Sequence, residues 1–146
     1  MAAPLAGRCL CGAVTVTVAA GAGEREVGAY HCRMCQRWSG GVFFCFSAPA
    51  GAVQVTGEAR IHASSPFAER GFCPSCGSHL WMRDTAEEGA PYDLMPGLFD
   101  AAHDWPLASE IYADRAMDCA RLAGDHPRRT RAEYEATNPA IEGDEP

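Results

Sequence analysis

The stretch Phe72-Cys73-Pro74-Ser75-Cys76-Gly77-Ser78 decides how this chain folds. Its two cysteines are separated by a proline and a serine and followed by a glycine, as in the tight turn of a zinc knuckle. Zinc takes four ligands in a tetrahedron with sulfur about 2.3 Å away, and a Cys-x-x-Cys turn supplies two of them. Pro74 presets one dihedral angle of the turn, and Gly77 can adopt the positive φ with which the chain leaves it. Two more ligands must therefore come from elsewhere in the chain.

The chain has eight cysteines in 146 residues, and six of them fall in close pairs. The pairs are Cys9 with Cys11, Cys32 with Cys35 and Cys73 with Cys76, while Cys45 and Cys119 stand alone. The N-terminus has neither the charged start nor the apolar stretch of a signal peptide, so we expect a cytoplasmic protein. In that reducing compartment, short paired spacings favour metal binding over disulfides.

Length and charge limit the possible architectures and partners. A chain of 146 residues has room for one substantial core, so we predict a single domain over 1–136. Residues 137–146 lack periodicity and are predicted to form a flexible tail. The net charge of −7 argues against sequence-independent binding to nucleic acid. No apolar run approaches the roughly 18 residues of a membrane helix, so we expect no membrane partner.

Short alternating segments between glycines and prolines predict a mostly β fold. Residues 13–18 and 53–56 alternate apolar and polar side chains, and the apolar run at 42–46 is typical of a buried strand. Helix-forming residues after Cys32, followed by two glycines, predict one or two helical turns. A weaker helical stretch covers 130–136. We therefore predict antiparallel hairpins with one or two short helices.

Two partitions of the thiols are compatible with their spacing. Cys73 and Cys76 could share a metal with Cys32 and Cys35, although the segment 36–72 exceeds the usual ~15–20 residues between such pairs. They could instead join the Cys9-x-Cys11 pair, whose side chains point to the same side of an extended chain. The spacing alone predicts a four-thiolate site and a leftover pair.

Three sequence blocks, in this order, resemble the glutathione-dependent formaldehyde-activating enzyme family. They are Cys9-x-Cys11-Gly-Ala-Val, His31-Cys32-x-x-Cys35-x-x-Trp38-Ser39-Gly40-Gly41 and Arg70-Gly-Phe-Cys73-Pro-x-Cys76-Gly-x-x-Leu80, and the likeness extends over about residues 5–115. The resemblance implies an Mss4-like fold, in which twisted antiparallel sheets are stitched together by a structural zinc. By position, Cys9, Cys11, Cys73 and Cys76 would hold that zinc.

The resemblance also implies a second, catalytic zinc, and here the chain departs from the family. The family's Cys-x-Cys-x-x-Cys block falls on residues 30, 32 and 35, but position 30 is Tyr30. A catalytic zinc keeps three protein ligands and one open position, so Cys32 and Cys35 would need a third donor. The candidates are His31, Cys45, His62, His79 and the phenol of Tyr30.

The activity that the resemblance implies is a carbon–sulfur lyase reaction. The thiol of glutathione adds to formaldehyde to give S-hydroxymethylglutathione, and the reverse reaction breaks the carbon–sulfur bond. Cys32 and Cys35 are then the candidate catalytic residues, and a small thiol and a small aldehyde the expected partners. Arg33, Arg37 and Arg70 lie beside the cysteine motifs and are candidates for binding the carboxylates of glutathione.

Two other functions use the same residues. Because Tyr30 replaces a family cysteine, the chain could be a zinc-stabilised binding module with a degenerate catalytic site. Alternatively, Cys32 and Cys35 could form a thiol redox switch without metal.

Several remaining residues have simpler interpretations. Cys45 lies among phenylalanines and Cys119 in an apolar segment, so both are predicted to be buried packing residues. His103 and His126 lie in loop-like segments and are predicted to be solvated.

Overall fold

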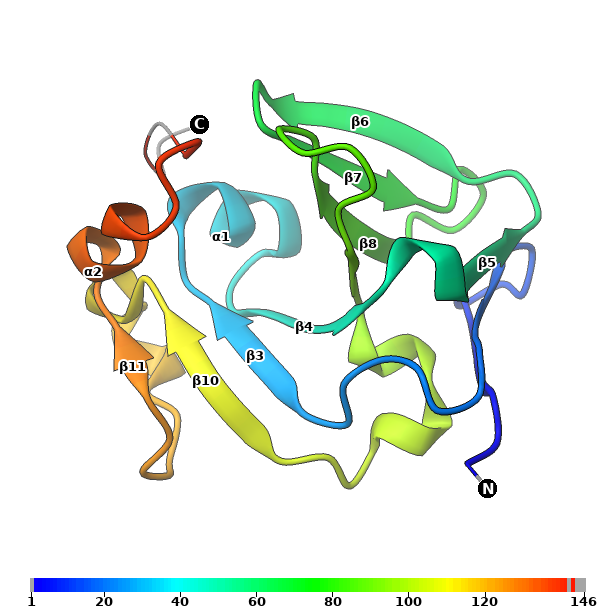
Figure 1. Cartoon of the computed structure of the whole chain (residues 1–146), viewed down its shortest axis with the longest axis horizontal. Helices are drawn as coiled ribbons and strands as arrows, with labels where there is room; N and C mark the ends of the chain where they lie inside the picture. Colours follow the sequence, from blue (N-terminus) through cyan, green and yellow to red (C-terminus); the bar gives the residue numbers. More distant parts are fainter. Residues whose placement is uncertain (1, 142, 144–146) are drawn as a thin grey trace. The chain divides into compact units, whose positions relative to one another are not determined.

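A computed structural model describes residues 2–141 and 143, and within them it has eleven strands and two α-helices (Figure 1). The prediction of a mostly β protein is confirmed. The chain divides into two compact units, each made of two separate stretches: residues up to 25 with 46–105, and 26–45 with residues from 106 onward. None of the described helices is both long and apolar enough to span a membrane.

The first unit contains a three-stranded antiparallel sheet. Its strands are β1 (Leu5–Arg8), β2 (Thr15–Val18) and β5 (Val53–Thr56), in the order β1-β2-β5. In β2 the valines are buried and the threonines only partly so, as the alternation predicted.

A second antiparallel sheet in this unit carries the knuckle. It contains the last three residues of β4 (Phe43–Ala48), then β9 (Tyr92–Leu94), β8 (His79–Asp84), β7 (Ala68–Phe72) and β6 (Arg60–Ser65). The knuckle joins β7 to β8, so a hairpin presents its two cysteines. Three short 3-10 helices complete the unit: η1 (Ala50–Ala52), η2 (Pro96–Leu98) and η3 (Asp100–Ala102).

Aliphatic and aromatic side chains fill the core of the first unit. The largest fully buried ones are Val14, Val16, Val18, Phe46, Leu80 and Leu94. The ring of Phe46 meets the rings of Phe99 and Trp105 edge to face, with centroids 5.2 and 4.9 Å apart.

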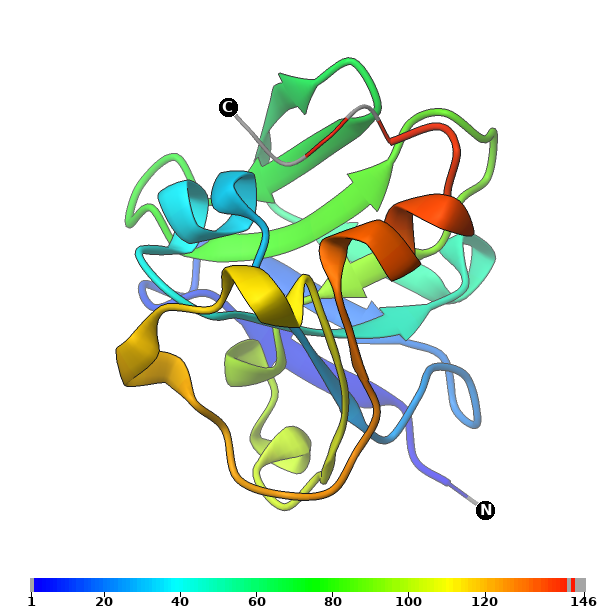
Figure 2. The same cartoon turned by 90° about the vertical axis from the view of Figure 1, so that its left-hand side faces the viewer.

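The second unit is a mixed sheet in the order β11-β10-β3-β4 (Figure 1). It consists of β11 (Arg128–Arg129), β10 (Leu107–Ile111), β3 (Val27–Tyr30) and the first three residues of β4. Strand β10 pairs in parallel with both β3 and β11, which differs from the antiparallel pairing predicted throughout. Figure 2 shows the excursion that separates β10 from β11, through η4 (Ala113–Arg115) and η5 (Asp118–Ala120).

Both predicted helical segments are helices of this unit. Helix α1 (Arg33–Ser39) is capped by Cys32 at its start and ends at Gly40, whose φ of 84° is the left-handed conformation favoured at helix ends. Helix α2 (Arg131–Ala136) begins with a capping box between Thr130 and Glu133.

The predicted tail lies partly outside the described residues, which omit 142 and 144–146. Its described part continues in hydrogen-bonded turns after α2, since the backbone N–H of Asn138 donates to Glu135 and that of Ile141 to Asn138.

Candidate functional site

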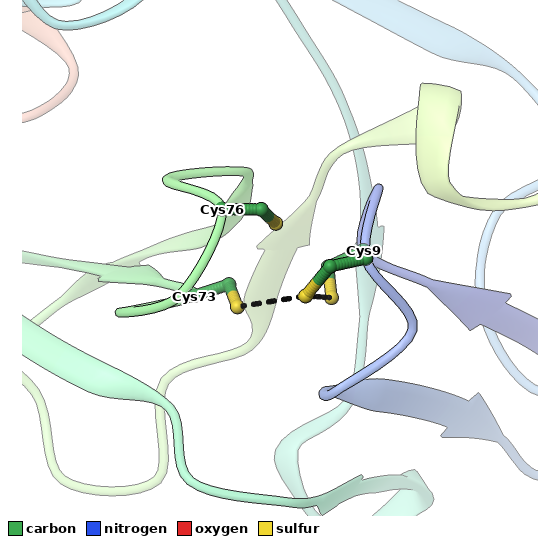
Figure 3. A group of neighbouring side chains, drawn as sticks. Cys9, Cys73 and Cys76 are labelled. Carbon is green, nitrogen blue, oxygen red and sulfur yellow. Dashed lines mark hydrogen bonds between the residues drawn. The ribbon is translucent and has the colours of Figure 1, made fainter.

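Four thiols converge in the first unit. Among the described residues, Cys9, Cys11, Cys73 and Cys76 are the one group of three or more His, Cys, Asp or Glu side chains whose ligand atoms lie close together, all within 4.8 Å. Figure 3 shows Cys9 on one side of the cluster and Cys73 and Cys76 on the other, with their sulfurs turned toward one another. The structure thus brings the pair Cys9 and Cys11 together with the pair Cys73 and Cys76. This is the grouping of thiols that the family resemblance implied.

The sulfur spacing fits a tetrahedral zinc. The Sγ atoms of Cys9 and Cys11 are 3.6 Å apart, and those of Cys11 and Cys73 are 3.8 Å apart. Four sulfurs each about 2.3 Å from a central zinc would be about 3.8 Å from one another. The four residues can therefore hold the metal with little movement.

Local backbone hydrogen bonds form both halves of this site. In the knuckle, the N–H of Gly77 donates to the carbonyl of Cys73, and Gly77 has the predicted positive φ, 77°. Strand β1 ends at Arg8, so Cys9 and Cys11 lie on a turn and not in the extended chain that their spacing suggested. That turn is closed by the N–H of Gly12, which donates to the carbonyl of Cys9.

The charge balance of the cluster also favours a cation. A hydrogen bond from the Ser78 hydroxyl lowers the pKa of Cys76 to about 5. The backbone of Ala13 lowers the pKa of Cys11, but contact with Cys9 and burial outweigh it and raise that pKa to about 11. Adjacent thiols resist ionising together because like charges repel, and a divalent cation removes this penalty.

The second cysteine pair has a different geometry. Cys32 and Cys35 are buried, and their sulfurs are 2.7 Å apart. The backbone N–H of Cys35 donates to the sulfur of Cys32 at 3.3 Å, which caps α1. Two ligands of one tetrahedral zinc would be about 3.8 Å apart. As arranged, this pair does not fit two corners of a catalytic zinc.

The candidate third donors have other surroundings. Tyr30 stacks at a tilt against Phe43, with ring centroids 5.7 Å apart. Cys45 is buried on β4, as predicted, directly opposite Gly28 of β3. His62 is exposed on β6, and His79 is half-buried on β8, where burial and the charge of Arg70 lower its pKa. His31 forms a different cluster.

Glu110 is the centre of a buried polar cluster that sequence analysis missed. One carboxylate oxygen is 2.6 Å from Nε2 of His31, and the other is 2.6 Å from Nε2 of His126 and 2.9 Å from Nε of Arg128. The prediction that His126 is solvated is wrong, because its side chain is only 6% exposed. Its carboxylate partner offsets the cost of burying the ring. No sequence signal connects these positions, since 79 residue numbers separate His31 from Glu110.

A glutamine anchors helix α1 to its surroundings, and a serine forms a hydrogen bond within the helix. The side-chain amide of Gln36 donates to the carbonyls of His31 and Arg115, at 2.7 and 2.8 Å. The hydroxyl of Ser39 donates to the carbonyl of Cys35 at 2.8 Å.

The three candidate arginines differ in exposure. Arg33 and Arg37 are exposed and one turn apart on α1, so they share a face of that helix. Arg70 is only 3% exposed on β7, and its Nε donates to the hydroxyl of Ser64. Cys119 is exposed, so its predicted burial is wrong; it lies in the short 3-10 helix η5.

This fold and the four-thiol cluster define a small, mostly β protein with a cysteine site of the kind that holds zinc. The family described as glutathione-dependent formaldehyde-activating enzyme matches residues 4–115. This chain belongs to that family, and its architecture is consistent with the Mss4-like fold.

Two individual proteins resemble this chain. A Schizosaccharomyces pombe protein named uncharacterized lyase C29B12.13 is 31% identical over 118 residues, which cover 80% of this chain and 84% of the relative. A crystal structure of a Rhodobacter sphaeroides protein matches with a TM-score of 0.56 at 18% identity, over 71% of this chain and all of that one. The second likeness concerns the fold alone.

Proposed function

We propose that this protein is a carbon–sulfur lyase that joins glutathione or a related thiol to formaldehyde or another small aldehyde, and catalyses the reverse cleavage. The family match over 4–115 and the lyase name of the yeast relative support this activity. The observation that carries the proposal is the intact Cys32–Gly41 block, a capped helix with two buried thiols and two exposed arginines.

The reaction requires one proton to move between sulfur and oxygen. The sulfur of the substrate thiol attacks the carbonyl carbon, the π electrons move to oxygen, and the thiol proton ends on that oxygen. Cys32 and Cys35 are the proposed catalytic residues, because both thiols are buried at the start of the helix that carries Arg33 and Arg37, and the sulfur of Cys32 donates to that of Cys35. Cys32, as the donor of this pair, would give its proton to the developing alkoxide, and the pair would take up the proton of the incoming thiol. No step is assigned to the family's second zinc, which this pair does not fit.

The exposed arginines of α1 are the proposed binding site for the substrate carboxylates. Glutathione is an anion at neutral pH, and the chain has a net charge of −7, so binding needs local positive charge. Arg33 and Arg37 lie one turn apart on the helix that carries both thiols. Arg70 is buried against Ser64 and is the weaker candidate for this role.

The proposed resident metal is one structural zinc at Cys9, Cys11, Cys73 and Cys76. Its contribution is to tie the turn after β1 to the knuckle between β7 and β8.

Adduct formation can be measured directly against the uncatalysed reaction. Nuclear magnetic resonance exchange spectroscopy of glutathione with formaldehyde gives the rate at which S-hydroxymethylglutathione forms and breaks. We expect wild type to raise that rate, Cys32→Ser to abolish the increase, and Arg37→Ala to raise the half-saturating thiol concentration. The exposed Arg129 of β11 provides the control, and Arg129→Ala should leave both values unchanged. A wild-type rate equal to the uncatalysed rate would contradict the proposal.

A binding module with a degenerate catalytic site is the alternative function. The replacement at Tyr30 and the short Cys32–Cys35 separation favour it. Both functions predict one zinc per chain, and they differ in the adduct-exchange rate, which the module would leave unchanged.

A further inference from the structure

We propose that Cys32 and Cys35 form a reversible intramolecular disulfide by exchange with a low-molecular-weight disulfide such as glutathione disulfide. The starting observation is their sulfur separation of 2.7 Å, against 3.6 and 3.8 Å in the four-thiol cluster. A disulfide bond is about 2.05 Å long, so bond formation needs a smaller displacement here than spreading to the zinc distance of about 3.8 Å.

The helix fixes both sulfurs in this arrangement. The Cys35 N–H holds the Cys32 sulfur at the start of α1, and the hydroxyl of Ser39 binds the carbonyl of Cys35. Gln36 anchors the same turn to His31 and Arg115. Because these contacts order the turn before reaction, the second thiol is already positioned to resolve a mixed disulfide.

Differences in exposure give the exchange a direction. Cys32 is 9% exposed and Cys35 only 1%, so an external disulfide reaches Cys32 first. The Cys32 thiolate attacks one sulfur of glutathione disulfide, forming a mixed disulfide and releasing one glutathione thiolate. The Cys35 sulfur then attacks Cys32, releases the second glutathione and closes the ring. Two protein thiols are oxidised to one disulfide, and one glutathione disulfide is reduced to two thiols.

Formation of the disulfide does not depend on the lyase activity. Its effect on activity, in contrast, rests on the proposed function. The oxidised pair has no thiol proton to exchange with substrate, so oxidation would switch the lyase off. In a reducing compartment, disulfides are usually transient and either catalytic or redox-sensing.

The test is a redox titration of the zinc-loaded full chain. The protein is equilibrated with mixtures of glutathione and glutathione disulfide, quenched with acid, alkylated, digested and analysed by mass spectrometry. As the mixture becomes more oxidising, we expect two alkylatable thiols per chain to disappear and one peptide to carry a Cys32–Cys35 bond. Zinc should stay bound, and excess glutathione should restore both thiols.

Single variants separate the two steps. Cys35→Ser should stop at a mixed disulfide of Cys32 with glutathione, whereas Cys119→Ser, at an exposed lone cysteine, should behave as wild type. The proposal is overturned if both thiols remain fully alkylatable under the most oxidising mixture. It is also overturned if the bond joins other cysteines with loss of zinc, or if wild type binds a second zinc that Cys32→Ser removes.

The adduct-exchange rate of the reduced protein distinguishes the two proposals. If the disulfide forms reversibly but the reduced protein does not accelerate adduct exchange, the proposed lyase activity is refuted and the proposed disulfide stands. If the protein accelerates adduct exchange and the oxidising mixture does not change that rate, the proposed redox switch is refuted and the proposed lyase activity stands.

Discussion

The sulfur of Cys11 lies 3.8 Å from the sulfur of Cys73, although the two residues are 62 positions apart in the chain. Cys9 and Cys73 are buried in the core of the first unit, whereas Cys11 is exposed and Cys76 is only partly buried. This relationship leads to the first prediction.

Removing the proposed structural zinc, or one of its ligands, should unfold the protein at moderate temperature. We expect Cys73→Ser to lower the free energy of unfolding by on the order of 4–5 kcal/mol, because metal sites are among the few features whose loss costs so much. Thermal unfolding followed by circular dichroism, with and without a chelator, measures the effect. Wild type with chelator should melt like the Cys73→Ser variant. Cys45→Ser, which lies outside the four-thiol cluster, should not show this loss of stability. A chelated wild type with its original melting temperature would show that the four sulfurs do not stabilise the fold through a metal.

Replacing Glu110 should destabilise the second unit. Its carboxylate accepts from His31, His126 and Arg128, and an amide in Glu110→Gln would leave at least one buried donor without an acceptor. An unsatisfied buried donor costs about 1–3 kcal/mol. Chemical denaturation at neutral pH measures the loss. The exposed Asp125 offers a control, and Asp125→Asn should leave the midpoint unchanged. Equal midpoints for Glu110→Gln and wild type would mean that the cluster contributes nothing to stability.

The same cluster predicts a dependence of stability on pH. Burial raises the pKa of Glu110, but hydrogen bonds from His126 and His31 outweigh it and hold that pKa below its ordinary value. A carboxyl with a lower pKa in the folded state stabilises the protein above its unfolded pKa, near 4.3, and loses that contribution as pH falls through the folded value.

The stability difference between wild type and Glu110→Gln should therefore be largest near neutral pH and shrink in the acid range below the ordinary glutamate pKa. Measuring a difference matters because His79, whose pKa burial and Arg70 lower, also takes up a proton on unfolding. Both proteins share that contribution, so it cancels. A difference that stays constant from neutral to strongly acid pH would contradict the prediction.

The contrast between the knuckle and the Glu110 cluster explains what sequence could predict. The knuckle is local: proline, glycine and two cysteines within seven residues determine its turn. The alternation of Val16 and Val18 with threonines likewise gave a strand whose buried face could be assigned. The spacing of the cysteines left two possibilities for which pairs share a metal site. Only the family resemblance selected the grouping that the structure has.

The Glu110 cluster has no local pattern. His31 directly follows β3, Glu110 lies on β10 and His126 lies on a loop, and each is unremarkable within its own segment. They meet only because β10 pairs in parallel with β3, and the hydrophobic period of a strand is the same for parallel and antiparallel neighbours. The short Cys32–Cys35 distance was equally inaccessible, since a Cys-x-x-Cys turn serves either a metal or a disulfide.

Gly71 on β7 should tolerate no side chain. A Cβ atom there would lie 2.4 Å from the indole ring of Trp81, which is buried on β8. We expect Gly71→Ala to destabilise the protein by about 1–3 kcal/mol, the usual cost of overpacking a core. Gly51 has open space around its Cα, so Gly51→Ala should change the denaturation midpoint little. Similar midpoints for the two variants would show that the indole ring moves aside at low cost.

A cysteine at position 30 should turn the redox pair into a metal site. Tyr30→Cys restores the third thiol of the family's block, and three protein ligands with one open position are what a catalytic zinc requires. The metal would have to spread Cys32 and Cys35 from 2.7 Å to about 3.8 Å, and its binding energy can drive that change. We expect the variant to hold two zincs per chain where wild type holds one, as measured by elemental analysis of dialysed protein.

Zinc binding and disulfide formation then compete for the same two sulfurs. In the zinc-loaded Tyr30→Cys protein, Cys32 and Cys35 should resist glutathione disulfide, and stripping the second zinc should restore their oxidation. Tyr30→Phe is the matched control, since it removes the phenol without adding a ligand and should behave as wild type in both measurements. If wild type and Tyr30→Phe already hold two zincs, then Cys32 and Cys35 are metal ligands in the native protein, and their 2.7 Å separation is not that of the metal-bound state.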